Sequence, residues 1–305
     1  MTAEPICLAC HGALARAPSV VTRDRMHDVP GFWSVHRCLA CGSGTTLPLA
    51  TEDQLSSFYP TDYAPFDLPT GATAEAMRLM QRARDRAFPL SSLAGGGSSG
   101  TLLDVGCGRG DLAASWIEAG WTVRGIEPSP EAASIARRRG AEVIEGTLAT
   151  VTLEPESIDG AVFRHSLEHV IDPQSDLRKV RAALRPGGRL AVIVPNWGSW
   201  QRRAFGEYWF PLELPRHRTH FTGAGLRAAL TAAGFDSIDV RPATPYITTT
   251  WSLQFRLFDR LLTGGGPALL LGYTASAPVS LLSRLLDAML GGGDFLHAAA
   301  RRPVG

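Results

Sequence analysis

The segment LLDVGCGRGDLA, residues 102–113, decides the fold of this chain. It begins as a buried strand, passes through a turn that holds Gly106, Gly108 and Gly110, and continues as a helix. Glycines at such a turn let backbone amides approach a ligand closely, and the start of a helix favours negative charge. The spacing is GxGxG rather than the GxGxxG of the dinucleotide fingerprint, which argues against a nicotinamide dehydrogenase.

From Thr101 onward, expected strands and helices alternate, which is typical of a parallel α/β sheet with helices on its faces. The strands are expected at 101–105, 121–127, 141–146, 158–164, 189–195, 235–242 and 294–303. The helices are expected at 111–120, 130–140, 174–184 and 221–233.

The string LDVGCGRG, with Glu127-Pro128 ending the next strand, resembles the class I S-adenosylmethionine-dependent methyltransferases. The strings FRHSLEHVIDP (163–173) and LRPGGRLAVIVPN (184–196) do so as well, and the resemblance covers residues 101–303. It implies a doubly wound α/β sheet of seven strands, the last antiparallel, and S-adenosylmethionine as the cofactor.

Glu127 ends the second strand 21 residues after Gly106, where a carboxylate can accept both ribose hydroxyls. The resemblance implies a wider cofactor-binding set. It comprises Asp104, Gly106, Cys107 and Gly108 at the methionine part, Glu127 and Pro128 at the ribose, Thr147 and Leu148 at adenine, and Arg164 and His165 beside the methyl donor. The family often places an acid near adenine, and the local string here, EGTLA, departs from that pattern.

Cys7, Cys10, Cys38 and Cys41 form the pattern CxxC–x27–CxxC. Two such knuckles can close a tetrahedral Zn–S₄ site, and in a cytosol paired thiols indicate zinc more often than disulfides. Four sulfur ligands leave no position for water, so we expect a structural zinc in a small ribbon-like domain. A redox dithiol and chance are the alternatives.

The segment that starts at His165 carries Glu168 and His169 at positions i+3 and i+4, which share one face of a helix. His169 is a candidate general base for a hydroxyl, and His165 is a second candidate. The alternatives are that the segment only braces a loop or, as in the ubiquinone-pathway O-methyltransferases it resembles, holds a divalent ion.

A long connection after the fifth strand carries aromatic residues and ends in PRHRTHFT, residues 215–222. We interpret it as a wall of the substrate site, with His217 and His220 as further candidate bases. Arg216 and Arg218 could hold an acidic group of the substrate or form a solvated face. The aromatic side chains either touch substrate or pack the connection itself.

The domain organisation follows from these segments. Residues 1–50 are expected to form the zinc domain, 51–100 a linker with a helix at 74–88 and a Gly/Ser stretch at 94–100, and 101–305 the methyltransferase domain. Residues 243–293 form an insert with two amphipathic segments. A hydrophobic lid, a homodimer surface and a peripheral membrane contact are its three open interpretations.

The chain of 305 residues has 30 basic and 29 acidic side chains, a net charge of +1 that argues against nucleic acid as partner. The start MTAEPICLACHG lacks the features of a signal peptide, and a cytoplasmic protein is expected. The predicted function is O-methylation of a small molecule, sugar or lipid-linked glycan. An RNA methyltransferase that uses the ribbon to bind RNA and a non-catalytic binding module are the alternatives.

Overall fold

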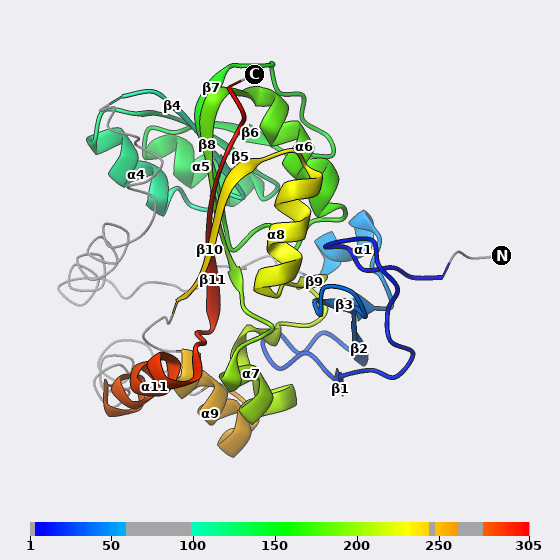
Figure 1. Cartoon of the computed structure of the whole chain (residues 1–305). Helices are drawn as coiled ribbons and strands as arrows, with labels where there is room; N and C mark the ends of the chain where they lie inside the picture. The colour runs from blue at the N-terminus through cyan, green and yellow to red at the C-terminus, as the bar shows by residue number, and fades with distance from the viewer. Residues whose placement is uncertain (1–3, 59–98, 244–247, 262–276, 305) are drawn as a thin grey trace. The chain divides into compact units, whose positions relative to one another are not determined.

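The structure is a computed structural model that describes residues 4–58, 99–243, 248–261 and 277–304 (Figure 1). The chain divides into two compact units. Unit 1 holds the described parts of Met1–Gln81, Pro195–Gly225 and Pro242–Leu296, and unit 2 holds those of Arg82–Val194, Leu226–Arg241 and His297–Gly305. The predicted helix at 74–88 and most of the predicted linker at 94–100 lie outside the described residues.

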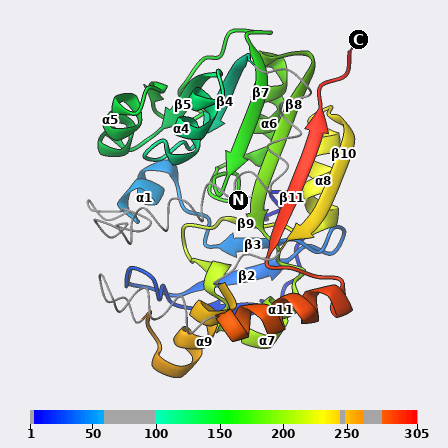
Figure 2. The same ribbon diagram turned by 90° about the vertical axis from the view of Figure 1, so that its left-hand side faces the viewer.

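The sheet of unit 2 has seven strands in the order β10-β11-β8-β7-β4-β5-β6, counted over the described residues. The strands are β4 (Thr101–Val105), β5 (Thr122–Glu127), β6 (Glu142–Glu145), β7 (Ile158–Arg164), β8 (Leu184–Pro195), β10 (Asp236–Ala243) and β11 (Phe295–Arg301). The helices are α4 (Asp111–Glu118), α5 (Pro130–Arg138), α6 (Pro173–Ala183) and α8 (Gly223–Ala232). The predicted doubly wound sheet with an antiparallel last strand, β11, is confirmed (Figure 2).

Strand β4 lies in the interior of this sheet, where it pairs in parallel with β5 on one side and β7 on the other. Leu102 and Leu103 are both buried although neighbouring residues of a strand face opposite sides, so apolar side chains cover both faces of β4. Trp116 and Trp121 pack edge to face on the core, with ring centroids 5.1 Å apart. The continuous apolar run TLLDV is therefore what an interior parallel strand requires.

Strand β8 begins earlier than the sequence predicts. It starts at Leu184 rather than Arg189, and α6 ends one residue before it, at Ala183. Leu184 already pairs with Ile158, and a register irregularity lies between this pair and the pair of Gly160 with Arg189. Residues 185–188, which lie between the predicted helix and the predicted strand, are therefore part of β8.

Unit 1 contains a four-stranded sheet in the order β1-β2-β3-β9, again counted over the described residues. Its strands are β1 (Val20–Thr22), β2 (Trp33–Arg37), β3 (Gly44–Leu47) and β9 (Thr219–His220). Its helices are α1 (Glu52–Ser57), α7 (Trp200–Phe205), η1 (Gly206–Tyr208), η2 (Phe210–Leu212), α9 (Thr248–Phe258) and α11 (Ala277–Leu290).

Segments far apart in sequence build the core of unit 1. Trp33 and Val35 of β2 pack with Trp197 and Trp209 from the connection that follows β8. The buried carboxylate of Asp294 accepts hydrogen bonds from the side chains of Ser199, Trp209 and Thr248. Unit 1 thus combines the cysteine-containing residues with the predicted substrate wall and insert, and the division into domains at 1–50, 51–100 and 101–305 stays a prediction.

A buried ion pair joins two of these segments. Arg216 directs Nη1 and Nη2 at the two carboxylate oxygens of Asp24, at 2.8 and 2.9 Å, and both side chains are at most 1% exposed. Asp24 also accepts hydrogen bonds from the backbone amides of Met26, His27 and Val29. Arg216 is therefore occupied by Asp24. The alternative that Arg216 and Arg218 form a solvated face is wrong, because the two side chains are 0% and 4% exposed and Arg218 donates to the backbone carbonyl of Ala50.

We predict that Asp24→Asn lowers the free energy of unfolding by about 3–5 kcal/mol, because it leaves the guanidinium of Arg216 buried without its counter-charge. Asp28→Asn is the matched control, since Asp28 is 85% exposed and pairs with Arg23 at the surface. Asp28→Asn should lower the free energy of unfolding by at most about 1 kcal/mol. Chemical denaturation measures both, and equal effects would contradict this account of the pair.

Candidate functional site

The glycine turn between β4 and α4 has the shape that the sequence predicts. Gly106 and Gly108 adopt φ values of +73° and +53°, which side chains disfavour. A Cβ on Gly106 would lie 2.7 Å from the Cβ of Ser166, whose hydroxyl donates to the carbonyl of Val105 at 2.6 Å. A Cβ on Gly108 would meet nothing within 4 Å, so the backbone at Gly108 borders open space.

Glu127 lies at the carboxyl end of β5, beside this turn. Its Oε2 accepts from the amide of Gly108 at 2.8 Å and its Oε1 accepts from the amide of Ser129 at 2.9 Å. Each oxygen keeps a second lone pair, so the carboxylate can also accept two ribose hydroxyls. Burial raises the pKa of Glu127, whereas the two amide hydrogen bonds lower it.

The predicted adenine segment reaches the same place. The amide of Gly146 donates to the backbone carbonyl of Glu127 at 3.1 Å, and Thr147 and Leu148 follow directly. Leu148 is buried and its carbonyl accepts from the ammonium of Lys179. The ends of β4, β5 and β6 thus bring the glycine turn, Glu127 and Thr147-Leu148 together at one edge of the sheet.

Two further residues of the predicted cofactor set are buried in this region. Asp104, in β4, is 2% exposed, and burial raises its pKa to about 6 although the charge of Arg164 opposes that rise. Burial, followed by the charges of Asp104 and Glu127, also raises the pKa of the Cys107 thiol. Cys107 is therefore a neutral, packed thiol, and its Sγ fills the space that a Cβ on Gly125 would occupy.

The segment at 165–169 corrects one expectation. It forms a turn after β7 rather than a helix, with the amide of His169 donating to the carbonyl of Ser166 at 3.2 Å. His165 has a left-handed φ of +56°, which interrupts helical geometry at the first position. Its Nδ1 nevertheless lies 3.7 Å from Oε1 of Glu168, so the i,i+3 contact survives in the turn.

His217 and His220 belong to unit 1, and both are buried. The Nδ1 of His217 hydrogen-bonds the carbonyl of Pro211 at 2.9 Å, and its Nε2 lies 3.3 Å from a carboxylate oxygen of Glu213. Burial, then the charges of His217 and Arg202, lowers the pKa of His220 well below its usual value. His220 is therefore a neutral imidazole at pH 7.

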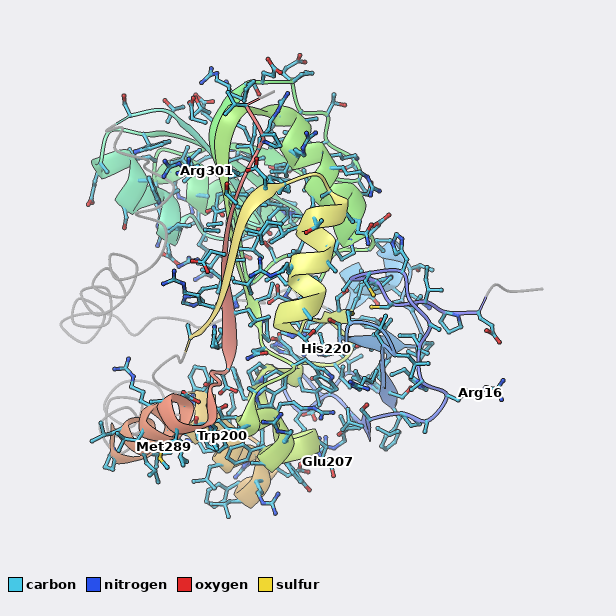
Figure 3. The ribbon with its side chains drawn as sticks, in the orientation of Figure 1. Arg16, Trp200, Glu207, His220, Met289 and Arg301 are labelled. Atoms are coloured by element: carbon cyan, nitrogen blue, oxygen red, sulfur yellow. The ribbon has the colours of Figure 1, made fainter. Side chains whose placement is uncertain are left out.

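The aromatic residues of the connection pack within unit 1. The indole of Trp200 (Figure 3) donates to Asp287 at 2.6 Å. The indole of Trp209 donates to Asp294, and the guanidinium of Arg202 covers the ring of Trp197. The side chains of Trp197, Trp200 and Trp209 therefore pack the connection itself, which is one of the two interpretations of its aromatic residues.

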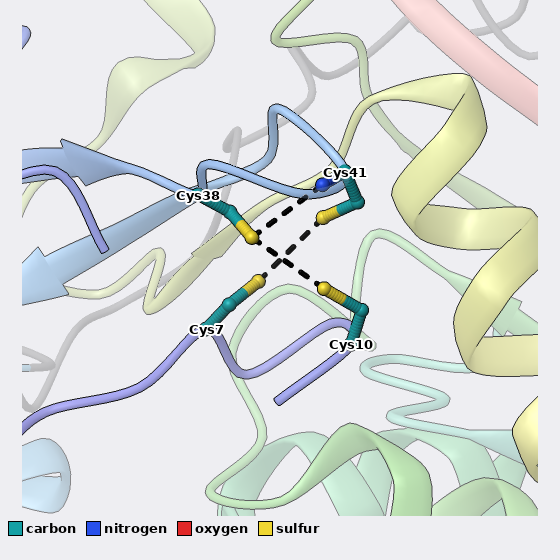
Figure 4. Close-up of side chains that lie close together, drawn as sticks. All are labelled: Cys7, Cys10, Cys38 and Cys41. Carbon is teal, nitrogen blue, oxygen red and sulfur yellow. Dashed lines mark hydrogen bonds between the residues drawn. The ribbon is translucent and has the colours of Figure 1, made fainter. Parts of the chain in front are cut away.

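The four paired cysteines converge as their spacing predicts (Figure 4). The sulfur atoms of Cys7 and Cys41 lie 3.7 Å apart, and those of Cys10 and Cys38 lie 3.5 Å apart. A tetrahedron with Zn–S bonds of about 2.3 Å has edges of about 3.8 Å, so these residues fit a zinc ion. All four cysteines are free thiols.

The surroundings of the cysteine cluster also suit a metal. The amide of Cys41 lies 3.5 Å from Sγ of Cys38, where it can donate to a thiolate. A Cβ on Gly12 would come within 3.2 Å of Sγ of Cys38 and 3.4 Å of Sγ of Cys10, so any side chain there would crowd the sulfur atoms. The hydrogen bond from Cys7 lowers the pKa of the Cys41 thiol, which favours the thiolate that a metal ion binds.

Ser166 and Ser129 were missed from the sequence as parts of this site. Ser129 caps α5 through a hydrogen bond from the amide of Ala132, and the string Ser-Pro-Glu after Pro128 is a recognisable helix start. Ser166 has no such local signal, because its contact with the glycine turn exists only in the folded sheet.

We predict that the purified protein carries one zinc ion per chain, because four thiolates at tetrahedral spacing bind zinc tightly. Cys10→Ala should abolish stoichiometric zinc, as measured by elemental analysis. Cys107→Ala is the matched control, since the fifth cysteine lies outside the cluster and should leave the zinc content unchanged. Full zinc occupancy in Cys10→Ala would refute this site.

A second prediction concerns Asp104, whose pKa rises from 3.8 to about 6 on folding. The folded state binds this proton more tightly, so ionisation of Asp104 opposes folding increasingly from pH 4 to 6 and fully above that range. Asp104→Asn removes this penalty. The effect of Asp104→Asn on the free energy of unfolding should therefore shift in the stabilising direction by about 2–3 kcal/mol between pH 4 and pH 7.5, at about 1.4 kcal/mol per pKa unit. Denaturation at both pH values tests this, and a pH-independent effect would contradict it.

No helix within the described ranges is both long enough and apolar enough to cross a membrane. The helix α11 of the predicted insert exposes several apolar side chains, including Leu281, Leu285 and Met289, which is 79% exposed (Figure 3). The lid, dimer and membrane interpretations of this insert stay predictions.

Comparisons with known proteins place the chain. A family model described as Methyltransferase domain matches residues 72–240, more than half of the chain. An uncharacterized 37.1 kDa protein in transposon TN4556 of Streptomyces fradiae is 43% identical over 107 residues, which are 32% of this chain and 31% of that protein. The ubiquinone biosynthesis O-methyltransferase of Cupriavidus pinatubonensis is 30% identical over 156 residues, covering 47% of this chain and 63% of that enzyme. The chain thus spans about a third of the first relative and slightly under two thirds of the second.

Solved structures show the same fold. An S-adenosylmethionine-dependent methyltransferase from Archaeoglobus fulgidus superposes with a TM-score of 0.51 at 16% identity, covering 73% of this chain and 94% of that one. Phosphoethanolamine N-methyltransferase 2 of Haemonchus contortus, solved with S-adenosyl-L-methionine, gives a TM-score of 0.51 at 18% identity, covering 83% of this chain and 57% of that one. With its seven-stranded sheet, glycine turn and matching domain model, this chain belongs to the class I S-adenosylmethionine-dependent methyltransferases.

Proposed function

We propose that this protein transfers a methyl group from S-adenosylmethionine to a hydroxyl of a small molecule, a sugar or a lipid-linked glycan. The observation that carries the cofactor assignment is the Glu127 carboxylate. It is 8% exposed, is held by the amides of Gly108 and Ser129, and lies beside the open backbone of Gly108. This arrangement offers two acceptors for a ribose diol and a close approach for the rest of the nucleoside.

The preference for oxygen as the methyl acceptor has two supports. Relatives that share 30% identity with about half of this chain are named ubiquinone biosynthesis O-methyltransferases. The balance of 30 basic and 29 acidic side chains offers no excess positive charge for RNA. A hydroxyl acceptor on a neutral or weakly charged molecule agrees with both.

The chain's own residues have defined tasks in such a transfer. Glu127 would hold the ribose, Asp104 and the glycine turn would border the methionine part, and Thr147 and Leu148 would flank adenine. S-adenosylmethionine, when bound, supplies a methyl group that its sulfonium already activates. The acceptor C–O–H loses its proton and gains the methyl carbon, so the protein needs orientation and one proton acceptor.

Of the two candidate bases in unit 1, His220 is the one with a ring nitrogen, Nδ1, that has no hydrogen-bond partner among the described residues. His217 instead directs both ring nitrogens at acceptors of its own segment. His165 and His169, on the turn after β7, remain candidates in unit 2.

We predict that Glu127→Gln weakens S-adenosylmethionine binding by about 10- to 100-fold, because hydrogen bonds to a charged group contribute about 1.5–3 kcal/mol. Glu145→Gln is a matched control. Glu145 stands opposite Glu127 in the β5–β6 register, but its side chain is 44% exposed and pairs with Arg137. Titration calorimetry measures both variants, and equal affinity of Glu127→Gln and wild type would overturn the assignment.

A further inference from the structure

The strand that carries His220 is held by the strand that follows the second cysteine knuckle. β3 pairs antiparallel with β9, with Gly44 opposite His220 and Thr45 opposite Thr219. The amide of Thr46 continues this pairing by donating to the carbonyl of Arg218 at 3.0 Å. A side chain at position 44 would not fit, since a Cβ there would lie 2.5 Å from Val35 and 3.2 Å from the Cβ of His220.

The second knuckle itself is fastened to the residues after β9. The hydroxyl of Thr222 donates to the carbonyl of Cys41 at 2.7 Å, and the amide of Thr222 donates to the hydroxyl of Ser43 at 3.1 Å. A Cβ on Gly225 would come within 3.2 Å of Sγ of Cys41. A metal ligand and the chain that follows His220 are therefore in direct contact.

The same ribbon fixes the tautomer of His220. The single hydroxyl proton of Thr46 is directed at the carbonyl of His217 at 2.6 Å, because a carbonyl oxygen can only accept. The oxygen of Thr46 must then accept from Nε2–H of His220, 2.9 Å away. The proton of this neutral imidazole thus resides on Nε2, and Nδ1 carries the lone pair.

That lone pair has no partner among the described residues. His220 is 2% exposed, and Nδ1 is a buried polar atom without a hydrogen bond. Leaving such an atom unpaired costs about 1–3 kcal/mol, so its retention needs a reason. The ring of the neighbouring Trp197, with its centroid 5.0 Å away, packs against the imidazole.

We propose that the zinc-binding ribbon is a positioning element for His220: Thr46 sets the tautomer that leaves Nδ1 free to accept a proton, and the metal-bound knuckle fixes the backbone that carries it. Thr46 is the positioning residue, and His220 is the group it prepares. The use of Nδ1 in methyl transfer rests on the proposed function, whereas the tautomer and the backbone restraint can be measured without any acceptor.

The first test compares Thr46→Val with Thr219→Val in zinc-loaded protein. Both variants remove a buried threonine hydroxyl, but that of Thr219 has no hydrogen-bond partner in the described chain. Long-range ¹H–¹⁵N NMR of the imidazole should show His220 protonated on Nε2 in wild type and Thr219→Val. In Thr46→Val the proton should redistribute between the two nitrogens. An unchanged tautomer in Thr46→Val would overturn the proposal.

The second test removes the metal from folded wild-type protein with a chelator and follows amide hydrogen exchange. The amides of His220, Phe221 and Thr222 should exchange at least about tenfold faster, while those of β4 and β5 keep their rates. Cys41→Ser provides the same comparison without a chelator. Unchanged protection of residues 220–222 in zinc-free protein would contradict the backbone restraint.

The third test connects positioning to chemistry. Thr46→Val should lower methyl transfer by at least about tenfold while the affinity for S-adenosylmethionine stays within about twofold of wild type, and Thr219→Val should leave both unchanged. Full activity in Thr46→Val would overturn the link between the tautomer and transfer. Absence of transfer by wild type across hydroxyl acceptors, with the NMR and exchange results as expected, would refute the proposed function and leave the positioning intact.

Discussion

The cofactor site depends on the hydrogen bonds that Glu127 accepts. Its two oxygens bind the amides of Gly108 and Ser129, and its backbone carbonyl binds the amide of Gly146. One residue at the end of β5 thereby fixes the glycine turn, the start of α5 and the segment after β6. Parallel register brings these three chain segments to the same edge of the sheet, so a single residue can organise them.

Much of unit 2 was predictable because its signals are local. The run TLLDV, the glycines at Gly106 and Gly108 and the helix start at Ser129 each encode an element within a few residues. The predicted strands 101–105 and 158–164 have the bounds of β4 and β7, and the boundaries of the other elements differ by a few residues. The larger error, at β8, arose because pairing of Leu184 with Ile158 keeps the backbone in the sheet through a Pro-Gly-Gly sequence that normally signals a turn.

The site of unit 1 could be predicted only as a list of residues. The CxxC spacing indicates a metal, but it does not predict that β3 pairs with β9. The paired residues Thr45 and Thr219 are 174 positions apart in the sequence. The ion pair of Asp24 with Arg216 and the tautomer of His220 likewise depend on partners far away in sequence. The sequence therefore shows which chemistry is available, whereas the fold decides which histidine keeps a free lone pair.

The most direct measurement is a crystal structure of the protein with S-adenosylhomocysteine. The account predicts that both ribose hydroxyls donate to the Glu127 carboxylate, that the backbone at Gly108 contacts the amino-acid part, and that Thr147 and Leu148 flank the adenine. A nucleoside bound away from Glu127, or a ribose held by other groups while Glu127 keeps only Gly108 and Ser129, would contradict the central claim.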